Sequence, residues 1–217
     1  MLVSLGSRVY YRTIASGVFH CERCGGDRPY RHRSGRRWAQ VLWLPVVPLH
    51  RTGEHLRCAI CRTCYRVELL AVPTAEQMQV ALLSATTAAT LAMLNAGGSA
   101  SQASRRRAIE LIISAGSQQY SEPDLETALE LSTQPPDAGL SRGPVPGLRG
   151  AVETLAIQLE TYSKEWFLGK VVQVGLADGS LSTAERDVVG TVAGYLGLSQ
   201  ARADDVIQTA EEAAQAG

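Results

Sequence analysis

The sequence predicts a mainly α-helical protein with a small β unit at its N-terminus. All five cysteines lie between Cys21 and Cys64, among short runs rich in β-branched and aromatic residues. After Pro73, apolar residues recur at helical spacing, with serine, threonine or glycine at the expected helix ends. The charge is divided as well. Residues 1–70 hold 12 arginines and 4 acidic residues, whereas residues 71–217 hold 9 basic and 17 acidic ones.

The bulk composition indicates a folded soluble chain. Its 217 residues suffice for one large domain or two small ones, and 45% apolar with 19% charged residues is ordinary for such a protein. Disorder, collagen and coiled coil are thereby excluded as classes. The divided charge predicts two domains with different surfaces, 1–70 and 71–217, which could attract each other.

The N-terminal domain is expected to consist of short strands between cysteine pairs. Residues 8–11 form a β-prone stretch, and residues 65–70 are expected as the closing strand. Residues 41–49 are too apolar for a free hairpin surface, so they should pack on the domain's own core, on the helical domain or on a partner, and we favour packing on the core or elsewhere within the chain. Because Pro45 and Pro48 cannot donate ladder hydrogen bonds, this run is at best an edge strand with a bend.

Two CxxC pairs, Cys21 with Cys24 and Cys58 with Cys61, predict a zinc site. Zinc takes four ligands tetrahedrally, and a CxxC turn places two thiolates on one side of the ion. Two such turns on two hairpins form a zinc ribbon. Four protein ligands leave no open position for water, so the site is structural. The alternative is a set of unmetallated or redox cysteines, but a redox pair normally lies in a βαβ context, which this segment lacks.

The fifth cysteine, Cys64, forms a further CxxC with Cys61, which leaves its role open. We favour the earlier pair because residues 65–70 then remain free as a strand. His20 and His32 are alternative ligands that we interpret as surface histidines. Clustered thiolates rather than disulfides indicate a reducing compartment, and the N-terminus lacks a signal-peptide pattern. A cytoplasmic location is therefore expected.

Residues 28–38 mix cations with aromatic side chains. Such a loop can follow phosphates and stack on bases, so a nucleic-acid adaptor is an alternative function. It would use four arginines: Arg31, Arg33, Arg36 and Arg37. The plainer interpretation is a solvated hairpin that stays soluble through its arginines or docks on the acidic domain. We favour it because no recognition helix accompanies the loop.

About seven helices are expected after Pro73, and a loop rich in proline and glycine at residues 133–147 separates the first three from the last four. Residues 80–96 are the most apolar stretch, but five polar side chains interrupt them. A membrane span needs about 20 mostly apolar residues, so we expect a soluble helix and no membrane insertion. The expected helices are 74–95 with Thr74 as its cap, 102–115, 121–131, 148–162, 163–177, 183–196 and 200–215.

A weak internal repeat crosses that loop, because residues 115–124 align with 176–185. In the second copy, Asp178 and Glu185 have the spacing of the second half of a calcium loop, but positions 174 and 176 carry no side-chain oxygen, which excludes an EF-hand. Helix capping explains the same residues, with Ser182 as the cap and Glu185 reaching back to it. Spacing favours capping, and a divalent cation stays open.

Residues 171–185 resemble the signature helix–turn–helix of the tellurite-resistance TerB family: an apolar helix, Ala-Asp-Gly, a short turn, and a helix that opens with glutamate. Residues 17–61, with their Leu-Pro-Val-Val-Pro-Leu run, resemble the zinc-ribbon segment attached to some actinobacterial TerB domains. The resemblance covers residues 17–215. It implies a helical bundle of two pseudo-repeats and a second divalent cation, whose ligands by position would be Asp178, Glu185 and Asp124. Ser117 stands where the second copy has Asp178, which weakens a shared site.

These patterns together predict a non-catalytic zinc-ribbon and TerB-like protein of the tellurite or chemical stress response. It would act as an interaction module with a protein partner, and nucleic acid is the alternative partner. No Ser/His/Asp or Cys/His arrangement and no phosphate loop supports an enzyme.

Overall fold

The computed structural model describes residues 5–41, 44–98, 101–116, 123, 126–127 and 147–215. The chain forms two compact units, Met1–Gln77 and Met78–Gly217. We describe each unit by itself.

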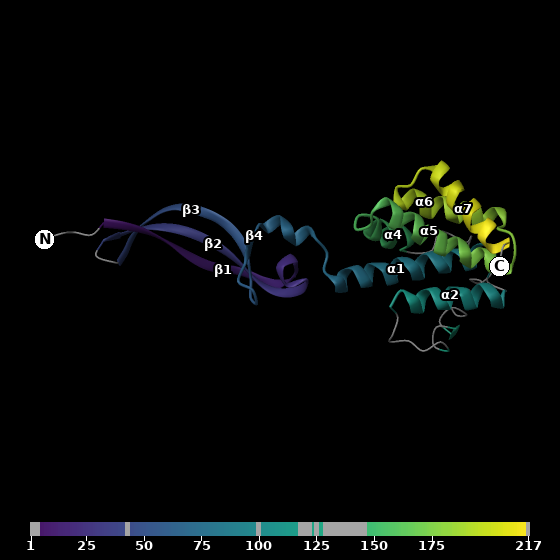
Figure 1. Cartoon of the computed structure of the whole chain (residues 1–217), viewed down its shortest axis with the longest axis horizontal. Coiled ribbons are helices and arrows are strands. Elements are labelled where there is room, and N and C mark those ends of the chain that lie inside the picture. The colour runs from purple at the N-terminus through teal and green to yellow at the C-terminus, as the bar shows by residue number, and fades with distance from the viewer. Residues whose placement is uncertain are drawn as a thin grey trace, which may run out of the picture. The chain divides into compact units, whose positions relative to one another are not determined.

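The N-terminal unit is an antiparallel sheet with strand order β1-β2-β3-β4 (Figure 1). Its first three strands are long, β1 Leu5–Cys21, β2 Gly26–Val41 and β3 Leu44–Cys58. The sequence had predicted only short strands there. Alternating arginine, aromatic and β-branched residues tolerate a pleated surface that is exposed to solvent, so pairing continues well beyond the cysteines.

Strand β3 lies at an edge of the sheet over most of its length. It pairs with β2 throughout, but β4, Cys64–Tyr65, pairs only with Leu56 and Arg57. The ladder between β2 and β3 shifts register three times, between Gly35 and Trp38 and again after Ala39. The edge position agrees with the prediction for residues 41–49, but the run is not one strand: β2 ends at Val41 and β3 begins at Leu44. The packing within the chain that was favoured for this run is also wrong, because its described aliphatic side chains on β3 are largely exposed.

The closing strand predicted for residues 65–70 is wrong in extent. The chain leaves the sheet after Tyr65, and Val67–Ala71 form a 3-10 helix. Leu69 turns inward from this helix and packs against the small core of the unit. A helical turn brings this apolar side chain against the core better than continued strand pairing would.

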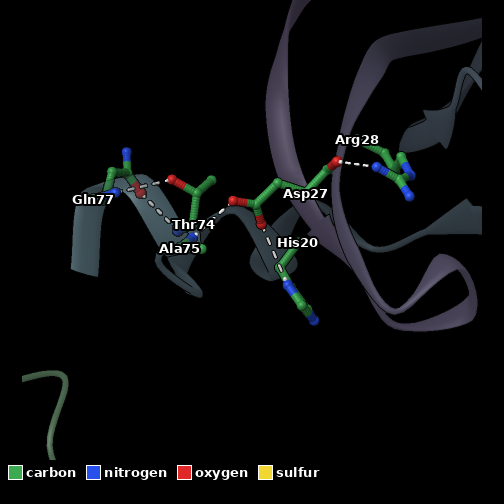
Figure 2. Close-up of polar contacts among 6 residues, drawn as sticks. All are labelled: His20, Asp27, Arg28, Thr74, Ala75 and Gln77. Carbon is green, nitrogen blue, oxygen red and sulfur yellow. Dashed lines mark hydrogen bonds and ion pairs between the residues drawn. The ribbon is translucent and has the colours of Figure 1, made fainter. Parts of the chain in front are cut away.

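The N-terminal unit ends in the first turn of helix α1, Ala75–Met93. Thr74 caps this helix as predicted: Thr74 Oγ1 accepts from Gln77 N at 3.3 Å, and Gln77 Oε1 accepts from Thr74 N at 3.0 Å. Asp27 of β2 adds a third acceptor, since its Oδ2 lies 2.8 Å from Ala75 N (Figure 2). His20 Nδ1 in turn lies 3.3 Å from Asp27 Oδ1. A carboxylate at a helix N-terminus stabilises the exposed amides there.

The C-terminal unit is a helical bundle, in which six α-helices are described where about seven were predicted. After α1, a π-helical turn at Leu94–Gly98 leads to the others. The third predicted helix, 121–131, lies almost wholly outside the described residues, as does the loop at 133–147. The remaining helices are α2 Gln102–Ser114, α4 Leu148–Ala156, α5 Thr161–Gly175, α6 Thr183–Leu196 and α7 Gln200–Gln215.

Helix α5 is the centre of the bundle and packs against α2, α6 and α7. Its buried side chains include Phe167, Leu168, Val171 and Val172. One stretch of the described chain, Val67–Gly97, is by length and composition apolar enough to cross a membrane, and 44% of its apolar window is buried. The buried alanines and Met93 of α1 belong to the same core as α5, which is the pattern of a core helix.

Candidate metal centre

The four cysteines predicted as ligands all lie at one end of the sheet. Cys21 is the last residue of β1, and Cys58 is the last residue of β3. Cys24 ends a 3-10 turn that Gly25 closes with φ of 63°, a conformation that glycine adopts without strain. Cys61 follows Cys58 in the second turn. Each pair thus combines a strand end with a tight turn, as a zinc ribbon requires.

The spacing of the sulfurs fits a tetrahedral zinc ion. The four Sγ atoms all lie within 4.8 Å of one another, and Cys21 Sγ is 3.7 Å from Cys61 Sγ. Zinc–sulfur bonds of about 2.3 Å give a tetrahedral edge of about 3.8 Å. All four thiols are free of disulfides. The donor set and its dimensions therefore suit one zinc ion held by four thiolates.

A small core surrounds this sulfur cluster. Phe19 and Leu56 are buried beside it, and the Phe19 ring packs edge-on against Tyr30 and Tyr65 at centroid distances of 5.6 and 5.5 Å. Two of the four most buried residues of this core are Cys21 and Cys58. These two metal ligands are therefore also part of the hydrophobic core.

The thiols differ in how readily they ionise. Burial and the neighbouring thiols Cys61 and Cys21 raise the pKa of Cys24 to about 11. Hydrogen bonds with Thr63, including the contact of 3.4 Å between Cys61 Sγ and Thr63 Oγ1, lower the pKa of Cys61 to about 6. Four adjacent thiolates repel one another, so a cation is needed to hold all of them deprotonated together.

Two residues near the sulfurs were missed as members of the site. Tyr65 Oη lies 3.3 Å from Cys21 Sγ and accepts from Arg23 N at 3.3 Å. Thr63 Oγ1 accepts from the Arg23 guanidinium at 3.2 Å. In the sequence, the only signal for Thr63 and Tyr65 was their position on either side of Cys64.

The other candidate ligands of this unit lie outside the sulfur cluster. Cys64 is exposed on β4 and is not a member of the four-sulfur group. His20 pairs with Asp27, and His32 Nε2 lies 2.9 Å from Glu54 Oε2.

The acidic turn of the bundle forms a capping box at the start of α6. Glu185 is only 3% exposed, and its Oε2 accepts from Ser182 N at 2.8 Å and from Ser182 Oγ at 2.7 Å. Ser182 Oγ in turn accepts from Glu185 N at 3.3 Å. Within the described part of the chain, Asp178 and Glu185 belong to no group of three or more metal-ligating side chains. Asp124 lies outside the described residues.

The basic residues lie on strand β2 and not in a loop, which corrects the sequence prediction. Successive strand residues point to opposite faces, so Arg31, Arg33 and Arg37 share one face and Arg36 lies on the other. Arg57 of β3 is the cross-strand partner of Arg31 and joins the first group. Its contribution could not be read from the sequence, because register was not predictable.

A groove of about 410 Å³ lies on the bundle between α5 and α7. Its lining mixes both charges with an aromatic ring, and Lys170 Nζ lies 5.4 Å from the Trp166 ring centroid. Arg202 pairs with Glu165 at 3.3 Å on its rim. This groove contains no arrangement of ligands or nucleophiles that suggests a reaction.

Comparison with known proteins adds one match. The family model described as tellurite resistance protein TerB matches residues 83–208. No curated protein and no solved structure matches the chain. The matched residues begin within α1 and end within α7, so they cover nearly all of the helical unit and none of the cysteines.

Proposed function

The chain belongs to the TerB family, and from this premise we propose that it is a non-catalytic interaction module of the tellurite or a related chemical stress response. The family match to residues 83–208 carries the proposal. The resemblance of residues 171–185 to the TerB signature is confirmed by that match. The association with stress and the non-catalytic role follow from the family and are our proposal for this chain.

We further propose that zinc is the metal of the N-terminal unit. Cys21, Cys24, Cys58 and Cys61 would hold it, because four soft thiolates at tetrahedral spacing favour zinc over hard cations such as magnesium. A bound ion would neutralise the sulfurs and join β1, β3 and both turns. All four positions are protein ligands, so the metal would act as scaffold.

A protein partner and a cytoplasmic location complete the proposal. A site of reduced thiols is compatible with a reducing compartment. A second divalent cation on the acidic turn stays a prediction, since the structure shows Glu185 serving as a helix cap. Nucleic acid likewise stays the alternative partner, and the grouping of Arg31, Arg33 and Arg57 on one face is the observation that favours it.

The proposal is tested by complementation in a strain that lacks the gene. The wild-type chain should restore growth on tellurite or during oxidative stress, and Cys21→Ser with Cys58→Ser should not. Cys64→Ser is the matched control and should complement. Elemental mass spectrometry of the purified chains should find one zinc in wild type and Cys64→Ser and none in the double variant.

Two results would contradict this proposal. One is a deletion strain with unchanged tolerance to tellurite and oxidants. The other is a reproducible turnover activity that disappears on substitution of Asp178 or Glu185, because it would make the chain an enzyme.

A further inference from the structure

One face of the sheet in the N-terminal unit combines cations with exposed aliphatic side chains. We define the basic face by the β2 residues Arg31, Arg33, Arg37 and Ala39 and their cross-strand partners, because directly paired residues share a face. The partners on β1 are Ser16, Thr13, Val9 and Ser7, and those on β3 include Arg57, His55 and Val47.

The charge of this region has one sign. Residues 1–21 and 28–53 contain eight arginines and no aspartate or glutamate. Three of these arginines, Arg31, Arg33 and Arg37, lie on the basic face, where Arg57 joins them, and the other five lie on the opposite face. Charge alone therefore does not distinguish the two faces, and the exposed aliphatic residues do.

On the basic face, Arg33 and Arg57 flank His55, whose ring packs edge-on against Tyr11 at a centroid distance of 5.1 Å. The residues that define the basic face include several guanidinium groups and no carboxylate, which makes the face complementary to a polyanion or an anionic surface.

The same sheet exposes aliphatic side chains near the β2–β3 turn. Leu44 is 69% exposed and Val47 is 51% exposed. Val47 pairs with Ala39, and Leu44 pairs with the position two residues further along β2, so both lie in register with the basic face. Val46 and Leu49 on the same strand are also largely exposed. Such a contiguous group on a soluble unit indicates a surface that becomes covered.

The addition of another strand at the edge of β3 does not explain why these aliphatic side chains are exposed. Pro45 and Pro48 stand on β3 where the strand is an edge, and proline blocks the addition of another strand. A partner that covers these residues must therefore meet their side chains and not their backbone.

We propose that the basic face docks on the surface of an anionic lipid bilayer. Arginines would contact lipid phosphates, and Leu44 and Val47 would enter the boundary between headgroups and acyl chains, as in peripheral proteins that combine an apolar group with a basic patch. This is surface binding and involves no spanning segment. The inference goes beyond the proposed function, which needs no membrane.

Lipid fits the observations better than nucleic acid does. A nucleic acid offers phosphates to the arginines and bases to Tyr11, but it gives no favourable environment to the exposed leucine and valine side chains. A bilayer surface satisfies both groups at once. Lipid binding should therefore depend on the exposed aliphatic residues, whereas nucleic-acid binding should not.

The test is flotation of the full-length, zinc-loaded chain with vesicles. Vesicles of phosphatidylcholine alone are compared with vesicles that also contain phosphatidylglycerol. Arg31→Gln with Arg33→Gln should lower partitioning to the anionic vesicles at least about tenfold. Leu44→Ser with Val47→Ser should lower it by a similar factor. The matched control is Arg8→Gln with Arg36→Gln, which removes equal charge from the opposite face and should retain most of the binding.

A single-stranded DNA oligonucleotide is titrated in parallel, and zinc content confirms that each variant is folded. Binding to anionic vesicles that depends on both pairs of residues supports the inference. No vesicle binding by wild type would overturn it. Binding of DNA that is lost with the arginines but unaffected by Leu44→Ser and Val47→Ser would assign the face to nucleic acid instead. Equal loss in the opposite-face control would show unspecific attraction. A failure here with intact zinc content and complementation leaves the proposed function standing.

Discussion

At the residue scale, His55 shows what the arginines do to their neighbours. Burial, and then the charges of Arg33 and Arg57, lower the pKa of His55 below its ordinary value, and His32 acts in the same direction. Protonation is therefore less favourable in the folded unit than in the unfolded chain. The N-terminal unit should lose stability as pH falls from the ordinary histidine pKa toward the lower folded value, and this contribution should be intact above the ordinary pKa.

His55→Gln tests this prediction. The variant should lose less stability than wild type between about pH 7.5 and about pH 5.5. The measurement is the urea midpoint with zinc in excess, so that proton competition at the cysteines affects both proteins equally. The exposed His50→Gln is the control and should behave as wild type. An identical pH dependence in His55→Gln would mean that neither burial nor the arginines lower the pKa of this ring.

Substitution of Glu185 distinguishes a role in helix capping from a role in metal binding. Glutamine also serves at the third position of a capping box, so Glu185→Gln should change the unfolding free energy little, whereas Ser182→Ala should cost about 1 kcal/mol. If Glu185 serves only as a cap, calcium or magnesium should shift the melting temperature of neither wild type nor Glu185→Gln. A wild-type stabilisation by either ion that is absent in Glu185→Gln would instead establish the cation site that the family resemblance implies.

At the element scale, two glycines of α5 differ in what surrounds them. A Cβ on Gly175 would lie 2.5 Å from Leu181 Cδ2 and 2.7 Å from Met93 Cε, whereas a Cβ on Gly169 would meet Val206 Cγ1 at 3.7 Å. Gly175→Ala should therefore destabilise the bundle by about 1–3 kcal/mol through overpacking. Gly169→Ala should be neutral or stabilise by up to about 1 kcal/mol, because alanine favours the helix. Denaturant melts of both variants check this, and equal effects would contradict the packing around Gly175.

The sequence predicted the helices where local signals mark their ends. Thr74 and the Ser182–Glu185 box begin α1 and α6, and Gly197 ends α6 in the left-handed region with φ of 74°. It failed between α4 and α5, where helix was expected to continue to 162 but α4 ends at Ala156. No glycine or proline marks this break, and tertiary packing of Leu159 against the core accompanies it.

The sheet was less predictable than the helices because local signals do not mark where its strands end or how they pair. The four cysteines were recognisable because metal geometry constrains their spacing. Strand length and register depend on pairing between distant segments, and a shift of one residue moves every side chain to the other face. The sequence therefore named Arg31, Arg33, Arg36 and Arg37 as one group. The alternation of faces along β2 sets Arg36 apart, and pairing with β3 adds Arg57 to the others.

At the scale of the whole molecule, the two units differ in what holds them together. The helical unit has a large core of apolar side chains from all six described helices and the turns between them. Among the described residues of the N-terminal unit, the fully buried core consists of Phe19, Leu56 and two cysteines. A core of this size rarely supplies more than about 3–5 kcal/mol, whereas a structural zinc site contributes about 10–16 kcal/mol of apparent binding energy at neutral pH.

Removing the metal should therefore unfold one unit and spare the other. A strong chelator under reducing conditions should abolish the β contribution to circular dichroism and expose the chain before Thr74 to protease. The helical signal and the thermal transition of the bundle should persist, because none of its core side chains comes from the N-terminal unit. Adding zinc back should restore the protected state. Simultaneous loss of the helical transition would show that the bundle depends on the zinc unit, and full resistance to chelation would show that the sheet is stable without metal.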